Sequence, residues 1–116
     1  MKNTVSINEN YRFRALYSRG KTAARKTVAA YAMKNRLKTV NRLGITVSVK
    51  LGKAVKRNRV KRRIKEAYRL LEPHVKRGWD IVLVARHGAL DASFGRITDD
   101  VAAALKALSL LEDQDE

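Results

Sequence analysis

Residues 50–65 read KLGKAVKRNRVKRRIK, and this stretch carries nine of the 26 Lys and Arg residues of the chain. Apolar residues run through it and past it at helical spacing: Val55, Val60, Ile64, Ala67, Tyr68 and Leu71. We therefore predict an amphipathic helix that follows a turn over residues 50–55 and extends to about Glu72, because Pro73 prevents its continuation. A folded helix holds its cations in a fixed array, which favours a polyanionic partner.

The charge of the chain is concentrated in its first part. The net charge is +15, and residues 1–65 contain 20 basic residues against a single acid, Glu9. Residues 66–116 contain six basic and ten acidic residues. We expect one side of the molecule to meet nucleic acid and the other to face solvent.

The size and composition of the chain fit one compact domain over residues 1–116, since 45% of its 116 residues are apolar. The absence of cysteine excludes disulfides and thiolate metal sites. No apolar run approaches membrane-spanning length, and the first ten residues lack the apolar stretch of a secretory signal. We expect a cytoplasmic protein that does not contact a membrane.

A short helix is predicted near the N-terminus, with Asn8 or Asn10 as its cap and Gly20 as its end. Three apolar residues at helical spacing lie within it: Phe13, Leu16 and Tyr17. Phe13 and Tyr17 at this spacing are, on general grounds, core residues.

Three strands are predicted from the periodicity of the remaining apolar residues. Residues 27–33 and 43–49 alternate, and the basic segment 34–42 would join them as a hairpin. Residues 79–85, WDIVLVA, form an uninterrupted apolar run that is typical of a central strand covered on both faces.

The last helix is predicted to start at Ser93 and to carry a wide apolar stripe, ahead of a frayed acidic end at residues 112–116. The order of elements is therefore helix, two or three strands, helix, strand, helix. This order predicts an α/β sandwich in which helices pack on a mostly antiparallel sheet.

The first turn of the basic helix is the strongest candidate for a phosphate site. Arg57, Asn58 and Arg59 lie where free backbone N–H groups and the helix dipole attract anions. The planar fork of arginine can donate two hydrogen bonds to a phosphate or to a base edge.

The residues around this turn resemble the signature of the bacterial ribonuclease P protein subunit. The matching positions are Gly52, Ala54, Val55, Arg57, Asn58, Arg59, Lys61, Arg62 and Glu66. The resemblance extends over nearly the whole chain, in the right order, at Asn10, Phe13, Tyr17, Gly20, Tyr31, residues 44–48, Gly78, residues 80–82 and residues 85–86. An Arg-Asn-Arg triplet surrounded by these matching residues is specific evidence for the family, whereas a run of basic residues alone is weak evidence.

The resemblance implies an α-β-β-β-α-β-α order with a left-handed β-α-β crossover, the ribosomal protein S5 domain 2-like fold. It also implies a role as the protein subunit of an endoribonuclease whose catalytic centre is in its RNA. The subunit would bind that catalytic RNA and help it to remove the 5′ leader from precursor tRNA. Cleavage would require magnesium ions, which the catalytic RNA would bind. The resemblance implies no cofactor, metal site or catalytic residue in the protein, and no protein partner.

The resemblance further implies two sets of site residues. Those that would contact the catalytic RNA are Lys50, Lys53, Lys56, Arg57, Asn58, Arg59, Lys61, Arg62, Arg63 and Lys65. Those that would line a cleft for the single-stranded leader are Phe13, Tyr17, Ala29 and Tyr31. Aromatic side chains beside a positive groove can stack bases without demanding a sequence.

Two other functions fit part of the sequence. The same charge supports a ribosomal or general nucleic-acid scaffold protein without a processing role. A self-sufficient nuclease could use His74 and His87, but each stands at the edge of a predicted element without a carboxylate placed to orient it. Asp99 and Asp100 are adjacent on a helix and diverge, so they make a poor metal pair.

Overall fold

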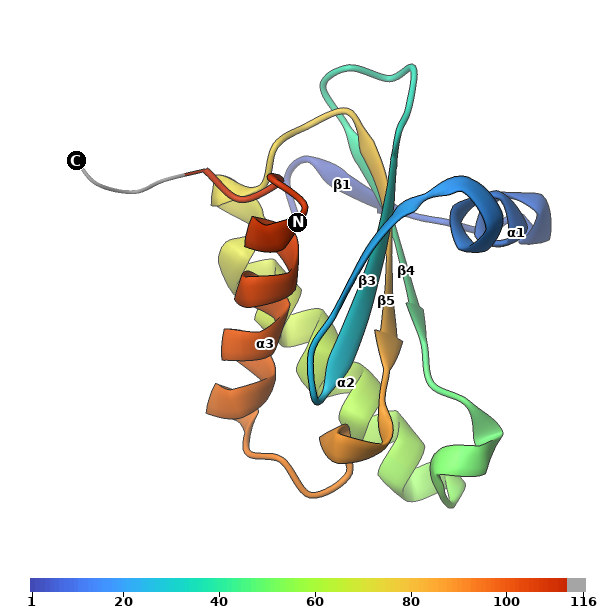
Figure 1. Ribbon diagram of the computed structural model, residues 1–116, viewed down its shortest axis with the longest axis vertical. Helices are drawn as coiled ribbons and strands as arrows, with labels where there is room; N and C mark the ends of the chain where they lie inside the picture. The colour runs from blue at the N-terminus through green and yellow to red at the C-terminus, as the bar shows by residue number, and fades with distance from the viewer. Residues whose placement is uncertain (113–116) are drawn as a thin grey trace.

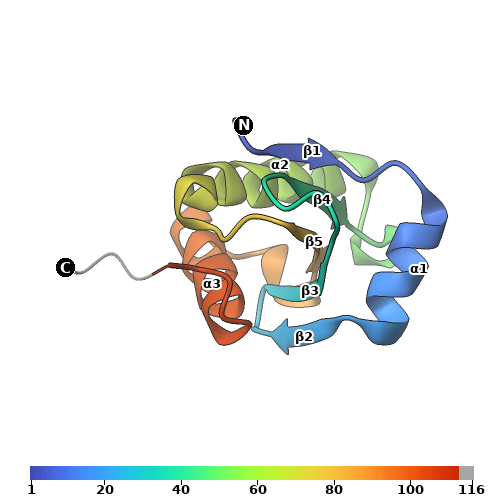
Figure 2. The same cartoon turned by 90° about the horizontal axis from the view of Figure 1, so that it is seen from above.

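The computed structural model describes residues 1–112. Its main elements are β1 (Thr4–Ser6), α1 (Asn10–Arg19), β2 (Lys21–Ala24), β3 (Val28–Lys34), β4 (Asn41–Thr46), α2 (Ala54–Leu71), β5 (Trp79–Ala85) and α3 (Phe94–Ala107). Three short 3-10 turns lie between them, η1 (Val49–Leu51), η2 (Glu72–His74) and η3 (His87–Ala89). The strands form one sheet; α1 covers one face, and α2 and α3 cover the other (Figures 1 and 2).

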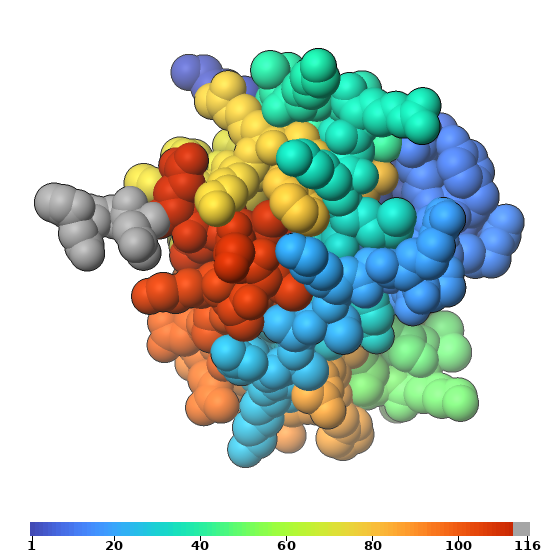
Figure 3. Space-filling model, turned by 45° about the horizontal axis from the view of Figure 1, so that its top comes forward, coloured from blue at the N-terminus to red at the C-terminus, as the bar shows by residue number. Residues whose placement is uncertain are grey.

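The order of strands in the sheet is β1-β4-β5-β3-β2. The predicted hairpin is wrong, because β5 lies between β3 and β4, antiparallel to β3 and parallel to β4. The sheet is mixed, and not mostly antiparallel as predicted, because β1 also pairs with β4 in parallel. The central position predicted for β5 is confirmed. The connecting loop is shorter than the predicted segment 34–42: it spans residues 35–40 and protrudes beside α1 (Figure 3).

Helix α2 connects the adjacent parallel strands β4 and β5. The chain leaves the end of β4, returns along the sheet as α2 and enters β5 in a left-handed crossover (Figures 1 and 2). Most β-α-β connections are right-handed. The left-handed sense is the one that the family resemblance implied. The connection places the basic helix on the sheet face shared with α3.

The ends of the helices follow local sequence chemistry in most places. Ser93 caps α3 as predicted, its Oγ accepting a hydrogen bond from the Arg96 backbone N–H at 3.1 Å. Gly20 ends α1, and α2 stops at Leu71 before the turn that contains Pro73. The predicted cap of α1 is wrong, since Glu9 occupies that position without a side-chain cap. The predicted fray at 112–116 lies largely outside the described residues.

Two apolar clusters lie on the two faces of the sheet. The larger one joins the sheet to α2 and α3. The smaller one, between the sheet and α1, is formed by Ile7, Leu16 and Val82 with Phe13, Tyr31, Met33 and Val84 packed against them. The predicted alternation of β3 is confirmed, with Val28, Ala30 and Ala32 buried toward the large cluster.

A buried carboxylate fixes α3 to the turn that precedes β3. The Asp100 Oδ2 accepts hydrogen bonds from the Thr27 backbone N–H at 3.0 Å and from the Thr27 Oγ1 at 2.7 Å. Burial raises the pKa of Asp100, but the Thr27 hydrogen bonds and the Arg96 guanidinium outweigh this effect and lower it. The charged form of Asp100 therefore stabilises the folded state.

We predict that Asp100→Ala lowers the free energy of unfolding by about 2 kcal/mol, because it leaves a buried N–H and hydroxyl without an acceptor. The loss in free energy of unfolding relative to wild type should be largest above pH 3.9, which is about the ordinary pKa of aspartate. It should shrink as the pH falls through the lowered pKa that Asp100 has in the folded protein. Urea unfolding between pH 7 and pH 3 measures it, with the exposed neighbour Asp99→Ala as control. Equal effects of the two variants would contradict the assignment.

Candidate nucleic-acid interface

Helix α2 is held to the protein by the apolar stripe predicted from its sequence. Val60, Ile64, Ala67 and Tyr68 are all buried, each 2% exposed or less. The hydroxyl of Tyr68 shares a hydrogen bond with the Thr4 Oγ1 of β1 at 3.2 Å, and burial raises its pKa. The helix is therefore a fixed support for the side chains on its outer surface.

The turn into α2 is fixed by local hydrogen bonds. The Ser48 Oγ accepts from the Lys50 backbone N–H at 3.2 Å, and Gly52 has a φ of 150°, a conformation that side-chain-bearing residues rarely adopt. The Arg57 Nε donates to the Gly52 carbonyl at 3.0 Å. Arg57, predicted to contact RNA, thus also holds the entry of the helix.

Arg63 differs from the other predicted RNA contacts because it is bonded within the protein. Its Nη1 donates to the Ala92 carbonyl, 3.0 Å away, in the loop before α3. Arg63 is partly buried there. It therefore ties α2 to the start of α3, a role that sequence reasoning missed.

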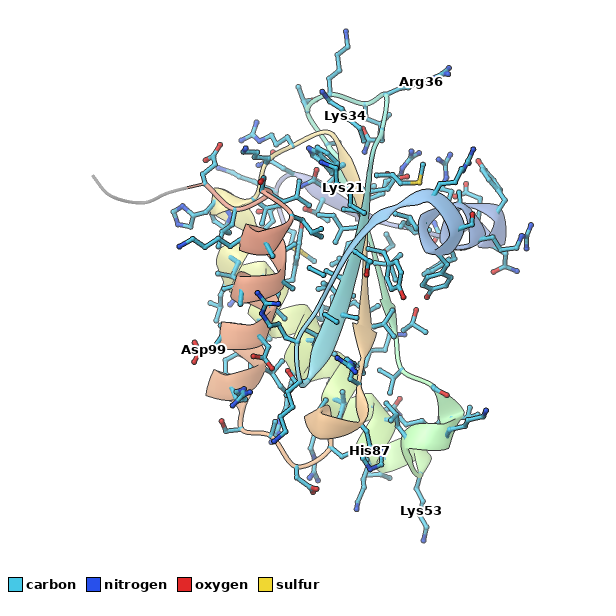
Figure 4. The ribbon with its side chains drawn as sticks, in the orientation of Figure 1. Lys21, Lys34, Arg36, Lys53, His87 and Asp99 are labelled. Carbon is cyan, nitrogen blue, oxygen red and sulfur yellow. The ribbon has the colours of Figure 1, made fainter. Side chains whose placement is uncertain are left out.

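The remaining predicted contacts are exposed and point away from the core. Within residues 1–112, no hydrogen bond or ion pair engages the side chains of Lys50, Lys53, Lys56, Asn58, Arg59, Lys61, Arg62 and Lys65. Lys53 extends into solvent from the end of the molecule where α2 begins (Figure 4). We call these eight residues the α2 surface.

The aromatic residues predicted to line a leader cleft lie together on the α1 face of the sheet. The Tyr17 ring meets the Tyr31 ring edge to face, with centroids 5.0 Å apart, and lies 6.5 Å from the Phe13 ring. The Tyr17 and Thr46 hydroxyls share a hydrogen bond at 3.1 Å. Ala29 lies two residues before Tyr31 on β3 and so shares its face.

The two predicted sites meet in one hollow. A depression of about 440 Å³ is lined by Phe13 and by residues of β1 and β4, together with Lys61 and Lys65 of α2. The Phe13 ring also packs over Gly44, where a Cβ atom would lie 2.6 Å from it. Sequence reasoning missed β1, a three-residue strand too short for a periodic signal, and with it this junction.

The two histidines do not form a pair. His74 precedes β5 and His87 follows it, so they lie at opposite ends of a seven-residue strand. Within the part of the chain that the structure describes, no group of three His, Asp or Glu side chains is arranged to hold a metal ion. Among residues 1–112, no helix combines the length and apolar character needed to cross a membrane.

Comparisons with known proteins agree on one family. The family model for ribonuclease P matches residues 1–109. A ribonuclease P protein component from Clostridium botulinum is 46% identical over 101 residues, which cover 86% of this chain and 90% of that protein. One from Caldanaerobacter subterraneus subsp. tengcongensis is 39% identical over 111 residues, which cover 96% and 95% of the two chains.

Solved structures give the same result. A Staphylococcus aureus RNase P protein mutant with defective mRNA degradation activity matches with a TM-score of 0.84 and 33% identity over 91% of this chain and 89% of that one. The RNase P protein from Thermotoga maritima matches with a TM-score of 0.79 and 26% identity, covering 88% and 96%. The fold, the basic helix and these matches show that the chain belongs to the ribonuclease P protein family.

Proposed function

We propose that this chain is the protein component of a ribonuclease P, which binds a catalytic RNA and helps it to remove the 5′ leader from precursor tRNA. The observation that carries the proposal is the α2 surface: a rigid, outward-facing array of side chains without partners in the described residues, on a chain of this family. The family match favours this role over a general scaffold. We expect it to act in the cytoplasm.

The α2 surface is suited to the backbone of folded RNA. The side chains of Arg59 and Arg62 are exposed, and arginine can bind a phosphate through two parallel hydrogen bonds. Each phosphate contact releases counterions, so binding should weaken steeply with salt. Cations at the protein–RNA junction also reduce the repulsion between two RNA polyanions, which helps the catalytic RNA to hold its substrate and its magnesium ions.

The α1 face is suited to a single strand. The rings of Phe13, Tyr17 and Tyr31 offer flat surfaces for unpaired bases, while Lys61 and Lys65 lie at the adjoining hollow, where they could meet phosphates. Stacking of this kind is worth about 1–3 kcal/mol per base and does not depend on base identity. We propose that the leader follows this path, and that the protein contributes binding and electrostatics while the bond cleavage belongs to the RNA.

The proposed role predicts that the purified protein alone does not cleave precursor tRNA, but restores cleavage by the catalytic RNA at low magnesium concentration. The reason is that fixed cations replace part of the screening that magnesium otherwise supplies. Single-turnover cleavage assays with and without the protein measure this effect. Equal stimulation by polylysine of matched charge would reject a specific subunit role.

We predict that Arg59→Ala combined with Arg62→Ala weakens binding to the catalytic RNA by at least tenfold and makes the dependence of log affinity on log salt less steep by about 1.5. Neither side chain has a partner within residues 1–112, so the fold should be retained. A filter-binding titration over a range of salt measures both quantities. Lys26→Ala with Lys106→Ala removes the same charge elsewhere, and an identical loss in that control would refute a localised contact.

For the leader, Phe13→Ala should reduce the preference of the holoenzyme for leader-bearing over leaderless tRNA by about tenfold, because one stacking surface is lost. Binding of the protein to the catalytic RNA should change little. Tyr17→Phe is the matched control, since it removes the hydrogen bond to Thr46 but keeps the ring. If Phe13→Ala weakened the binding of catalytic RNA as much as the preference for leader-bearing tRNA, Phe13 would have a structural role only.

A further inference from the structure

Helices α2 and α3 lie side by side on one face of the sheet (Figures 1 and 2), and a hollow opens between the middle of α2 and the first turn of α3. It has a volume of about 370 Å³, and its lining consists of Arg59, Arg62, Arg63, Glu66 and Phe94. We call it the α2–α3 hollow. Arg59 and Arg62 belong to the α2 surface, but neither proposed RNA site includes Phe94.

The α2 side of the hollow is a single row of side chains. Arg62 and Arg63 lie three and four residues after Arg59, and Glu66 lies four and three residues after them. Residues three or four positions apart are neighbours on the surface of a helix, so all four share one face of α2, beside its buried stripe. The helix therefore directs three guanidinium groups toward one space.

The α3 side of the hollow is the ring of Phe94, the first residue of that helix. The Phe94 side chain is partly buried: it packs against the large apolar cluster and also lines the hollow. Two hydrogen bonds fix the backbone around it. The Thr98 Oγ1 donates to the Phe94 carbonyl at 2.9 Å, and Arg63 donates to the Ala92 carbonyl. The ring is thus held in place with part of its surface open to a ligand.

Most of the positive charge around the hollow is uncompensated. Glu66 is the one acid in its lining, and the Arg69 Nε donates to the Glu66 Oε1 at 2.9 Å. This hydrogen bond lowers the pKa of Glu66, so the carboxylate is ionised and paired with Arg69 rather than with an arginine of the hollow. Within residues 1–112, Arg59 and Arg62 have no ion-pair partner. The hollow therefore attracts an anionic ligand.

An aromatic ring beside arginines has the chemistry that binds an unpaired nucleotide of RNA. Unstacked bases stack on aromatic rings and on guanidinium planes, and arginine also donates hydrogen bonds to the phosphate. A base within a regular double helix cannot enter such a site, because its neighbours cover both of its faces. The volume of the hollow lies in the range of about 300–1,000 Å³ that small-ligand sites occupy. The hollow therefore fits one nucleotide that stands out from a folded RNA.

We propose that the α2–α3 hollow binds an unpaired nucleotide of the catalytic RNA, with the base stacked on Phe94 and the phosphate held by Arg59 and Arg62. This contact rests on the proposed function, and it adds a base contact to a surface that otherwise binds phosphates. The catalytic RNA, and not the leader, is its source because these two arginines belong to the α2 surface. The aromatic cluster proposed for the leader lies across the sheet, on the α1 face (Figure 2).

Phe94→Leu separates stacking from apolar packing, because leucine keeps contact with the large apolar cluster but has no flat face. Its affinity for the catalytic RNA should fall about tenfold, and the salt dependence of binding should stay unchanged because no charge is lost. Phe94→Tyr, which keeps the ring, should bind within about twofold of wild type. Filter binding over a range of salt measures both quantities, and urea unfolding reports the stability of each variant.

Tyr11→Leu is the matched control, since Tyr11 is an aromatic residue of α1 that is 55% exposed and lines neither the hollow nor the aromatic cluster. Its affinity for the catalytic RNA should equal that of wild type. Wild-type affinity in Phe94→Leu would overturn the proposal, as would equal losses in Phe94→Leu and Phe94→Tyr. In both cases a protein that still restores cleavage at low magnesium concentration would leave the proposed function standing.

A fluorescent reporter tests the same contact independently of affinity. Trp79 is the only tryptophan of the chain, so Trp79→Phe combined with Phe94→Trp leaves a single indole, in the hollow. A base stacked on that indole should quench its emission when the catalytic RNA is added and shield it from acrylamide. Emission and acrylamide access that do not change with the catalytic RNA would overturn the proposal. Quenching only when precursor tRNA joins the assembled holoenzyme would overturn the assignment to the catalytic RNA.

Discussion

The burial of one stripe of helix α2 is the interaction on which the rest of the structure depends. Ile64, Ala67 and Tyr68 are fully buried against α3 and the sheet, and burial of a large apolar side chain contributes about 1.5–3 kcal/mol. This burial opposes the mutual repulsion of nine cations between residues 50 and 65. The free protein therefore holds its cations in a concentrated array, and binding to an anion relieves that repulsion.

The two faces of the sheet are covered to different extents. Helices α2 and α3 cover one face with the large apolar cluster, whereas α1 covers part of the other with a smaller one. Gly44 lets the Phe13 ring lie close to β4, and Tyr17 remains 43% exposed beside it. The left-handed crossover of α2 then brings Lys61 and Lys65 to the hollow that Phe13 lines. One topology thus places aromatic and cationic groups side by side.

Sequence periodicity predicted the helices, the central strand and the buried stripe of α2, because each depends on neighbours within one element. It did not predict strand order: the alternation of residues 43–49 fits a hairpin with β3 as well as the observed parallel pairing with β5. The same limit applies to Arg63, which looks like a surface cation until α3 places the Ala92 carbonyl beside it. Contacts between distant segments require the tertiary structure.

Hydrogen exchange of the α2 backbone in the free protein tests the central claim most directly. If the buried stripe holds a rigid helix, the amides of residues 58–68 should exchange only through openings close to the global free energy of unfolding. Protection should then change little when RNA binds. Exchange of these amides at the rate of an unfolded peptide, with protection appearing only in the presence of RNA, would contradict the claim that α2 displays a preformed cationic surface.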